Sequence, residues 1–437
     1  RLAIQELGPT FIKLGQILST RPDMIPADWA KELKRLQSDI PPVDFEEVEA
    51  SLNSEFRGGW KAVFRSIEPT PIAAASIAQV HRAVLLDGTP VVVKVLRPGI
   101  RKVIDADMEI LRVFAGVLEK RLEHAGYSAS EVVNQFAEEL ERETDLEREG
   151  RNAERMARDF AHHRVVRFPR VFWEATTDTV LTMEEAPGTV LSRTDLNDFT
   201  EQQRHDIAVA CADMVFRQCL ELGFFHADPH PGNIFIETDP DNVHRLLRDA
   251  EQARKAAQPE TRKRSIPITL KGETPPAAAT VGLELPKPDI DISSEGVTVS
   301  LGAGDNDEQQ QDPTVVVTFI DCGMTGQVEP RSMEQIAAIV HGALTRDIDD
   351  VLEVVIQISD AEPQIAQDRR VRADTWRFLD RFGGGSLGEL RMGELLNEFF
   401  ALLRRHQLRC PADVVHLIKA ITTIEGVGEE VAPDFDI

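Results

Sequence analysis

Long apolar runs are missing from this chain of 437 residues. No run approaches the roughly 18 to 20 residues that a membrane-spanning helix needs, so the sequence as given predicts no span. Cysteine is scarce too. The four cysteines form no C-x-x-C pair and no metal-site spacing: Cys211, Cys219, Cys322 and Cys410. These absences argue against a disulfide framework and favour a reducing compartment.

Basic residues are also in short supply, because 49 Lys and Arg stand against 74 Asp and Glu, a net charge of −25. So acidic a balance argues against nucleic acid as a partner. The chain begins at Arg1 without a methionine. We therefore expect a fragment whose missing ends could carry targeting or membrane segments. The 437 residues are enough for two lobes.

Glycine is lacking at one place where it would be expected. In "TPIAAASIAQVHRAVLLDGTPVVVKVLRPG", residues 70 to 99, two apolar runs flank a turn and the second run carries Lys94. Such a hairpin is typical of a nucleotide site in which a lysine reaches phosphates. The loop before it should then be glycine-rich, but it is formed by Ala73, Ala74, Ala75 and Ser76. The simpler interpretation is that small residues pack a tight turn.

The order of the predicted elements is mixed. Helices are expected over residues 1–40, strands over 60–98, charged helices over 101–160, strands again within 165–188, and helices over 201–225 and 329–437. Residues 237–314 contain no Phe, Trp or Tyr and several prolines. That segment cannot bury much apolar surface, so we predict a disordered insertion with a candidate hairpin in "DIDISSEGVTVSL".

The sharpest chemical signal is "HADPHPGN", in which His226, Asp228 and Asn233 have the spacing H-x-D-x-x-x-x-N. This is the catalytic-loop pattern of protein kinases. There the aspartate approaches the acceptor hydroxyl, and the asparagine turns inward to hold magnesium. A polar turn with a capping aspartate is the alternative for so short a pattern.

Two further signals follow the kinase order. Asp321 ends a valine-rich strand in "FIDCG", where kinases place the metal-binding aspartate of D-F-G, and Cys322 replaces the phenylalanine. Lys94 in "VVVKV" matches the phosphate-binding lysine. Each signal alone has an ordinary alternative, a simple turn or a solvated lysine. A glutamate should orient that lysine, but "EELERETDLEREGRNAERM" offers many, and spacing alone selects none.

These residues together resemble the UbiB family of atypical kinase-like proteins, also called the AarF or ABC1-type family. The resemblance begins at "LGPTFIKLGQILSTRPDMIP", with a K-x-G-Q motif at Lys13, Gly15 and Gln16. It continues through "AAAS", an E-x-D motif from Glu143 to Asp145, "FHADPHPGN" and the closing "IEGVGEEVAPDFDI". It covers nearly the whole chain, and the two longest motifs are very specific in combination.

The resemblance implies an α+β, protein-kinase-like fold of two lobes with an N-terminal K-x-G-Q helical extension over the active site. The expected domains are this extension (1–60), an N-lobe (61–190) and a mainly helical C-lobe (191–437) interrupted by the insertion 237–314. Lys94 would pair with Glu149 and contact phosphates, while Glu143 and Asp145 would meet Lys13. The full expected set is Asp228, Lys94 and Lys13 as catalytic residues; Ala73, Ala74, Ala75, Ser76, Lys94, Glu149, Glu143, Asp145 and Gln16 around ATP; and Asn233 and Asp321 on Mg²⁺.

The same resemblance suggests which function the alanines serve. Glycine permits close backbone approach to phosphates, whereas an alanine Cβ crowds the γ-phosphate region. The K-x-G-Q helix would cover the groove of a peptide substrate. Both features argue against protein phosphorylation. The resemblance implies a Mg²⁺-dependent ATPase or small-molecule kinase that supports ubiquinone or related prenyl-lipid biosynthesis.

Three further expectations concern partners and place. A membrane lipid or quinone precursor would be the partner, with a lipid-biosynthetic protein complex as a further one. The family implies membrane association, facing the cytoplasm or an organelle interior, and its members often carry membrane-spanning helices beyond the point where this chain stops. The alternatives are a protein serine/threonine kinase and a non-catalytic nucleotide-binding scaffold.

Overall fold

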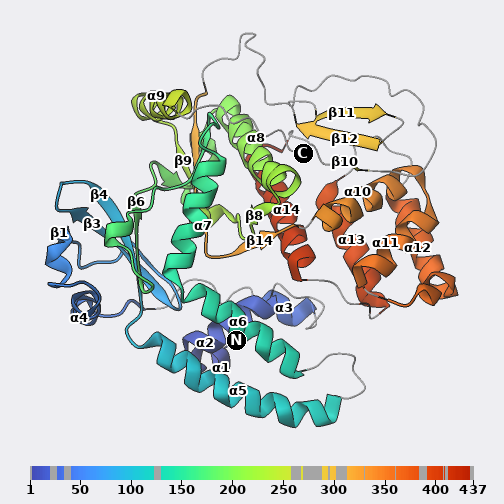
Figure 1. The fold of residues 1–437 in the computed structure, drawn as a ribbon, viewed down its shortest axis with the longest axis horizontal. Helices are drawn as coiled ribbons and strands as arrows, with labels where there is room; N and C mark the ends of the chain where they lie inside the picture. Colours follow the sequence, from blue (N-terminus) through green and yellow to red (C-terminus); the bar gives the residue numbers. More distant parts are fainter. Residues whose placement is uncertain are drawn as a thin grey trace. The chain divides into compact units, whose positions relative to one another are not determined.

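The computed structural model describes residues 2–19, 27–33, 41–122, 129–256, 267–268, 288–293, 296–301, 313–328, 330–359, 361–382, 391–406, 408 and 412–433. The chain divides into two compact units. Unit 1 comprises Arg1–Arg158, Phe168–Ala186 and Ile320–Met324; unit 2 comprises Asp159–Arg167, Pro187–Phe319 and Thr325–Ile437. Both units contain helices and strands (Figure 1), which confirms the α+β class. The predicted domain boundaries after residues 60 and 190 stay predictions.

Unit 1 contains an antiparallel sheet with the strand order β1-β3-β4-β6 and with β2 paired to β3. Val91, Val93 and Val95 of β4 are buried in one core. Successive side chains of a strand point to opposite faces, so Lys94 lies on the other face from these valines. The strands are β1 (Phe64–Ile67), β2 (Ala73–Ala74), β3 (Ala78–Leu85), β4 (Pro90–Leu96) and β6 (Val180–Glu184).

The helices of unit 1 pack on this sheet and on one another. Val48 and Leu52 of the fourth helix enter the same core as the valines of β4. Ile12 and Leu33 form a small separate cluster that joins the second helix to the third. The helices are α1 (Leu2–Leu7), α2 (Pro9–Ser19), α3 (Ala27–Leu33), α4 (Phe45–Glu55), α5 (Ile100–Leu122), α6 (Ala129–Glu143) and α7 (Leu146–Asp159), with 3₁₀ turns at Trp60–Ala62 and Trp173–Ala175.

Unit 2 has a four-stranded sheet with the order β5-β13-β9-β7 and a two-stranded pair, β14-β8. These strands flank the segment that carries the kinase-like loop. The strands are β5 (Val166–Arg167), β7 (Thr189–Val190), β8 (Phe224–His226), β9 (Ile234–Glu237), β13 (Val316–Phe319) and β14 (Thr325–Gln327). Because β9 and β13 pair antiparallel, the long segment between them leaves and re-enters the sheet at adjacent strands, as expected for an insertion.

Helices make up most of the rest of unit 2. A core cluster that includes Ile339, Val355, Phe378 and Leu395 joins four of them. The four helices of this cluster are α10 (Pro330–Thr345), α11 (Ile348–Ser359), α12 (Arg369–Phe382) and α13 (Met392–Arg405). Unit 2 also contains α8 (Glu201–Arg217) and α14 (Ala412–Val431), a π-helical turn at Gln218–Leu222, and 3₁₀ turns at Leu191–Arg193, Leu196–Asp198, Pro231–Asn233 and Pro363–Gln367. Over the described residues, no helix combines the length and apolar character needed to cross a bilayer.

The predicted insertion is partly ordered, which corrects the prediction. Its first part forms helix α9 (Pro240–Ala256). Val243 and Leu246 of this helix bury against Val316 of β13, so even a segment without aromatic residues has an apolar face to pack. The hairpin predicted in "DIDISSEGVTVSL" is present as β11 (Pro288–Ser293) and β12 (Gly296–Leu301), with β10 (Pro267–Ile268) beside it. The other residues of the insertion lie outside the described ranges.

Candidate functional site

Unit 1 carries a group of candidate residues around Lys94. Its ammonium group donates to both carboxylate oxygens of Glu149, each at 2.8 Å, and lies 3.4 Å from Oδ1 of Asp321. The side chains of Lys94 and Glu149 are 16% and 4% exposed, whereas that of Asp321 is 48% exposed. The sequence expectation that Lys94 pairs with Glu149 is therefore met in space, and the aspartate of "DCG" joins the pair.

Local sequence explains why Glu149 points inward. The buried positions of α7 include Leu146, Glu149, Ala153 and Met156, which recur at helical spacing along one face. Gly150 beside them lets the helix approach the sheet, because a Cβ there would lie 3.1 Å from side-chain carbons of both Leu181 and Trp173. The carboxylate is thus carried on an apolar face that cannot turn to solvent without losing its packing.

Burial and charge compete at this pair. Burial alone would lower the pKa of Lys94, but the carboxylates of Asp321 and Glu149 outweigh it and raise that pKa. Burial raises the pKa of Glu149 to about 7, with Asp321 and Glu143 adding to the rise and Lys94 opposing it. Burial likewise raises the pKa of Glu143, against the effect of Lys13. Two lysine–glutamate pairs are therefore buried in unit 1, and Asp321 adds a third carboxylate beside Lys94.

Lys13 of α2 forms an ion pair with Glu143, at the end of α6. Their side chains are 17% and 10% exposed. Gln16 follows Lys13 by three positions on α2, so both lie on the same face of that helix. The structure thus brings the lysine of K-x-G-Q onto the glutamate of E-x-D within unit 1.

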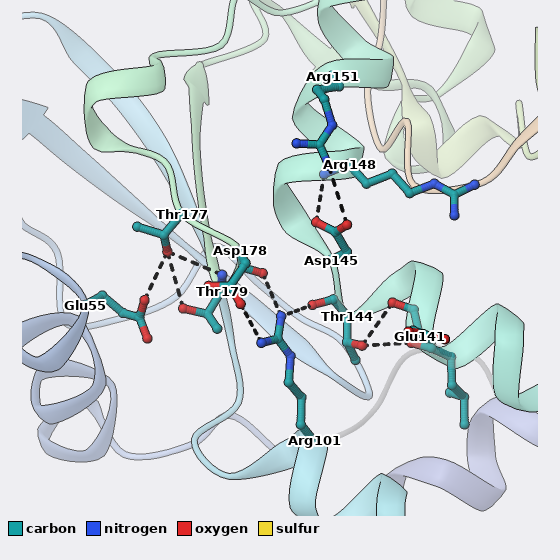
Figure 2. Close-up of polar contacts among 11 residues, drawn as sticks. Glu55, Arg101, Glu141, Thr144, Asp145, Arg148, Arg151, Thr177, Asp178 and Thr179 are labelled. Atoms are coloured by element: carbon teal, nitrogen blue, oxygen red, sulfur yellow. Dashed lines mark hydrogen bonds and ion pairs between the residues drawn. The ribbon is translucent and has the colours of Figure 1, made fainter.

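Asp145, the last residue of E-x-D, does not take part in that pair, which corrects the sequence expectation. Its Oδ1 accepts the backbone N–H of Arg148 at 2.9 Å, and its Oδ2 lies 3.5 Å from Arg151 (Figure 2). This is an N-cap of α7: the carboxylate satisfies an amide that has no partner within the helix. The two acidic residues of the motif therefore have different roles: Glu143 pairs with Lys13, and Asp145 caps the helix that carries Glu149.

Arg101 is a positioning residue that the sequence did not reveal. Its guanidinium donates to Thr144 O at 2.6 Å, to Asp178 O at 3.0 Å and to the Asp178 carboxylate at 2.6 Å (Figure 2). The backbone N–H of Leu146 also donates to Asp178 O. These bonds hold the connection between α6 and α7 against the turn before β6. No local signal marks Arg101, because its partners lie far along the chain.

The alanine loop is a short hairpin rather than an open flap. Ala73 and Ala74 pair with Val80 and Gln79 of β3, and the Ala75 N–H donates to Ala78 O at 2.8 Å. Among described residues other than glycine, only Asp321 and Arg346 have positive φ. The loop therefore keeps negative φ angles, which alanine adopts without strain.

The guanidinium of Arg97 anchors this hairpin by hydrogen bonds to backbone carbonyls. The Nε of Arg97 donates to Ala75 O at 3.0 Å, and its Nη2 donates to Pro41 O at 2.8 Å. Ser76, the last residue of the predicted loop, is buried. The loop is thus fixed at its carbonyl and closed on itself, which limits how far its amides can rotate toward a phosphate.

The D-C-G segment holds its aspartate in an unusual backbone conformation. Asp321 has φ +57°, in the left-handed region that residues other than glycine rarely adopt. A Cβ on Gly323 would lie 3.3 Å from Asp321 Oδ1 and 3.5 Å from Glu149 Oε2, so glycine leaves room for both carboxylates. Cys322 is buried, and burial raises the pKa of its thiol well above the ordinary value. That cysteine fills space and is no nucleophile.

Unit 2 carries a separate group of candidate residues, in the loop after β8. The ring of His226 is buried against Phe319 and accepts the backbone N–H of Asp228 at its Nδ1, 3.2 Å away. The backbone N–H of His226 donates to Oε1 of Gln218, which lies in the π-helical turn. The histidine of the motif therefore shapes the loop from inside, and it does not face a substrate.

Asn233 is held so that its oxygen remains available. Its Nδ2 donates to Asp228 O at 3.1 Å, and its Oδ1 accepts no hydrogen bond from the part of the chain that the structure describes. An amide oxygen is a ligand that Mg²⁺ accepts. The described residues contain no group of three or more His, Cys, Asp or Glu side chains placed to bind a metal. Kinase sites hold Mg²⁺ with one or two side chains and substrate phosphates.

Asp228 has a cationic partner that the sequence analysis missed. Lys419 of α14 lies with Nζ 2.8 Å from Asp228 Oδ1, and His230 Nε2 is 3.9 Å from Oδ2. Burial by itself would raise the pKa of Asp228, but Lys419, with His230 and His226, outweighs burial and lowers it. Asp228 is thus held as a carboxylate.

The geometry defines a protein-kinase-like protein: a strand lysine paired with a helix glutamate, a D-x-G aspartate, and a catalytic-type Asp-Asn loop. Residues 35–250 match the ABC1 atypical kinase-like domain, and residues 376–436 match the UbiB helical domain. The chain belongs to this ABC1/UbiB family of atypical kinase-like proteins. The recognition made from its motifs is confirmed.

Several relatives and one solved structure are similar to the chain. The probable protein kinase UbiB of Marinobacter nauticus is 29% identical, covering 100% of this chain and 67% of the relative. The chloroplastic protein Activity of BC1 complex kinase 7 of Arabidopsis thaliana is 27% identical, covering 100% and 52%. This chain therefore spans about half to two thirds of their length. The Mycobacterium tuberculosis Rv3197–erythromycin complex superposes with a TM-score of 0.52 at 20% identity, covering 97% of this chain and 92% of that one, and it supports the fold alone.

Proposed function

We propose that this protein is a Mg²⁺-dependent ATPase or small-molecule kinase that supports ubiquinone or related prenyl-lipid synthesis at a membrane. The observation that carries the proposal is the buried contact of Lys94 with Glu149 beside Asp321. Active kinases require this lysine–glutamate pair and a metal-binding aspartate to be in place together. Membership of the UbiB family supports the link to ubiquinone.

Each residue has a definite part in the proposed reaction. The metal, when bound, would neutralise charge on the phosphates; Asp321 and Asn233 would hold it. Lys94 would bind phosphate oxygens, oriented by Glu149. Asp228 would orient the attacking hydroxyl or water and accept its proton, a role that requires the ionised form that Lys419 favours.

The N-terminal helices weigh against a protein serine/threonine kinase. Lys13 on α2 forms an ion pair with Glu143, which lies six positions before Glu149. Helix α2 therefore lies beside the pair of Lys94 and Glu149. A peptide acceptor would need that space. The scaffold alternative is disfavoured for another reason: a protein that only binds nucleotide has no need of an intact Asp228 and Asn233 loop.

The test follows the γ-phosphate of ATP. The purified chain is incubated with Mg²⁺ and γ-³²P-ATP, alone, with liposomes containing anionic lipid, and with a phenolic quinone precursor. We expect slow release of free phosphate, or label on the phenol, that rises with lipid or precursor. Label on protein would instead establish the protein-kinase alternative, and binding without turnover in every condition would establish the scaffold.

A further prediction concerns the alanine loop. Ala74→Gly removes a Cβ and loosens a strand residue by about 0.5–1 kcal/mol, so the hairpin should open and ATP should gain several-fold in affinity relative to ADP. Ala73→Gly has the same backbone cost at a neighbouring residue whose side chain points to the opposite face, so an effect of the Ala74 Cβ should appear in Ala74→Gly alone and an effect of backbone loosening in both variants. Isothermal titration with Mg²⁺-ATP and Mg²⁺-ADP measures both affinities. An unchanged ratio in Ala74→Gly would show that the alanines do not set nucleotide preference.

A further inference from the structure

The catalytic-type loop of unit 2 supplies no permanent cation of its own. From His226 to Glu237 the sequence reads "HADPHPGNIFIE", without Lys or Arg. Transfer of a γ-phosphoryl group spreads negative charge over its oxygens and needs cations aimed at them. Next to the aspartate of this loop, the cation has to come from another part of the chain.

Lys419 is that cation in the structure. It lies on α14, which packs against α8 and β14 within unit 2, and its Nζ is 2.8 Å from Asp228 Oδ1. The side chains of Lys419 and Asp228 are 24% and 27% exposed, so both can still meet a substrate. The other neighbour of the carboxylate, His230, accepts the N–H of Gly232 at Nδ1 and keeps its Nε2 on the Asp228 side.

The position of Lys419 in its helix is otherwise apolar. From Val414 to Ile424 the sequence is "VVHLIKAITTI", in which Lys419 is the one Lys, Arg, Asp or Glu. Val415, Ile418 and Ile421 around it are buried. A lysine in such a stretch costs free energy unless its charge is paired. An apolar residue would pack this helix as well, so the charge points to a task at the loop.

We propose that Lys419 is a catalytic residue that binds the γ-phosphate of ATP beside Asp228. In doing so, the C-terminal helical region supplies the cation that the loop lacks. The inference rests on the proposed phosphotransfer function and adds a residue to it. On arrival of the nucleotide, Nζ would be shared between Asp228 Oδ1 and a γ-phosphate oxygen, leaving Oδ2 for the acceptor.

The chemical step balances as follows. The oxygen of water, or of a substrate hydroxyl, forms a bond to the γ-phosphorus while the bond from that phosphorus to the β,γ-bridging oxygen breaks. ADP leaves with the electron pair of the broken bond. The proton of the attacking oxygen passes to Asp228 and from there to solvent. Lys419 keeps its proton throughout and stabilises the charge on the phosphoryl oxygens.

The experiment compares Lys419→Gln, Lys419→Arg and a control in the full chain. Arg391→Gln is the matched control, because it removes the cation paired with Glu429 of the same helix, at 2.9 Å and in an exposed setting. Binding is titrated with the Mg²⁺ complexes of ADP and of the non-hydrolysable analogue AMP-PNP, and turnover is measured as phosphate release. We expect Lys419→Gln to lower kcat about 100-fold and to weaken AMP-PNP binding but not ADP binding. Lys419→Arg should retain most of the AMP-PNP affinity.

A readout on the unmodified chain covers the case in which Lys419→Gln fails to fold. Acetic anhydride labels lysines, and mass spectrometry measures the label at Lys419. Mg²⁺-AMP-PNP should protect Lys419 several-fold more than Mg²⁺-ADP does.

The outcomes separate this inference from the proposed function. Equal loss of ADP and AMP-PNP binding, or equal protection by both nucleotides, would give Lys419 a purely structural role and overturn the inference. The proposed function would stand as long as the unmodified chain turns over ATP. No turnover by the unmodified chain, with protection specific to AMP-PNP, would overturn the proposed function and leave Lys419 as a γ-phosphate ligand. No nucleotide binding at all would overturn both.

Discussion

Magnesium-dependent ATP turnover is expected to fall by roughly 100- to 1000-fold in Asp321→Asn. The substitution keeps the shape of the side chain but removes the charge that would hold the metal. It also removes one of the two carboxylates within 3.4 Å of the Lys94 ammonium. The loss should appear in kcat more than in the affinity for ADP without metal, because the nucleotide keeps its contact with Lys94.

The matched control for this variant is Asp105→Asn, an exposed acid on α5 of the same unit. It changes the net charge equally, so it corrects for any general electrostatic effect. Phosphate release is measured over a range of Mg²⁺ concentrations for both variants. Turnover in Asp321→Asn that equals that of Asp105→Asn at every Mg²⁺ concentration would remove Asp321 from the metal site and weaken the whole kinase-like assignment.

The second large effect concerns folding stability. Lys94→Met removes the partner of a carboxylate that is 4% exposed, and breaking a buried pair in this way costs about 3–5 kcal/mol in the free energy of unfolding. Lys102→Met, an exposed lysine at the start of α5, is the control and should cost little. Urea unfolding of the three proteins measures the difference.

The cost of Lys94→Met should depend on pH with a definite sign. In the unmodified chain the pKa of Glu149 is already raised to about 7, from an ordinary value near 4.5, and without Lys94 it should rise further. A carboxyl with a raised pKa binds its proton more tightly when folded, so stability is lost as pH rises from the ordinary value to the raised one. The loss ends near pH 7 in the unmodified chain but continues above pH 7 in the variant.

The stability gap between the two proteins should therefore widen from pH 6 to pH 8. The double variant Lys94→Met/Glu149→Gln removes the titrating group, and it should recover much of the stability and lose the pH dependence of the gap. Neither variant should recover ATP turnover. A gap that is constant between pH 6 and pH 8 in Lys94→Met would mean that Glu149 is not the buried, titrating partner of this lysine.

Much of the site was predictable because its residues stand in short motifs. Asp228 and Asn233 are five positions apart on one loop, and a loop that short fixes their separation by its own covalent geometry. The run "VVVKV" predicted a strand with Lys94 in it, and β4 is that strand. Glu149 was harder to identify, because the charged segment offers many glutamates. Only the family resemblance pointed to it.

Other features could not be predicted from the sequence, because they depend on packing between distant segments. The motif E-x-D is compatible with Asp145 either facing Lys13 or capping α7. The structure shows the cap, because Asp145 accepts the backbone N–H of Arg148. Helix α9 was not predicted, because the segment lacks aromatic residues, whereas the helix is held by the aliphatic side chains of Val243 and Leu246. Arg101 has partners that no local pattern marks.

By itself, the sequence determined the class of this protein and the chemistry that its motifs can perform. Residue type and short spacing carry that information, since a few covalent bonds limit where neighbouring side chains can go. The family resemblance had already paired Lys94 with Glu149 and Lys13 with Glu143, and both pairs are present. Only the tertiary structure revealed that Lys419 meets Asp228. Each of these pairs joins segments that apolar packing, and not chain proximity, brings together.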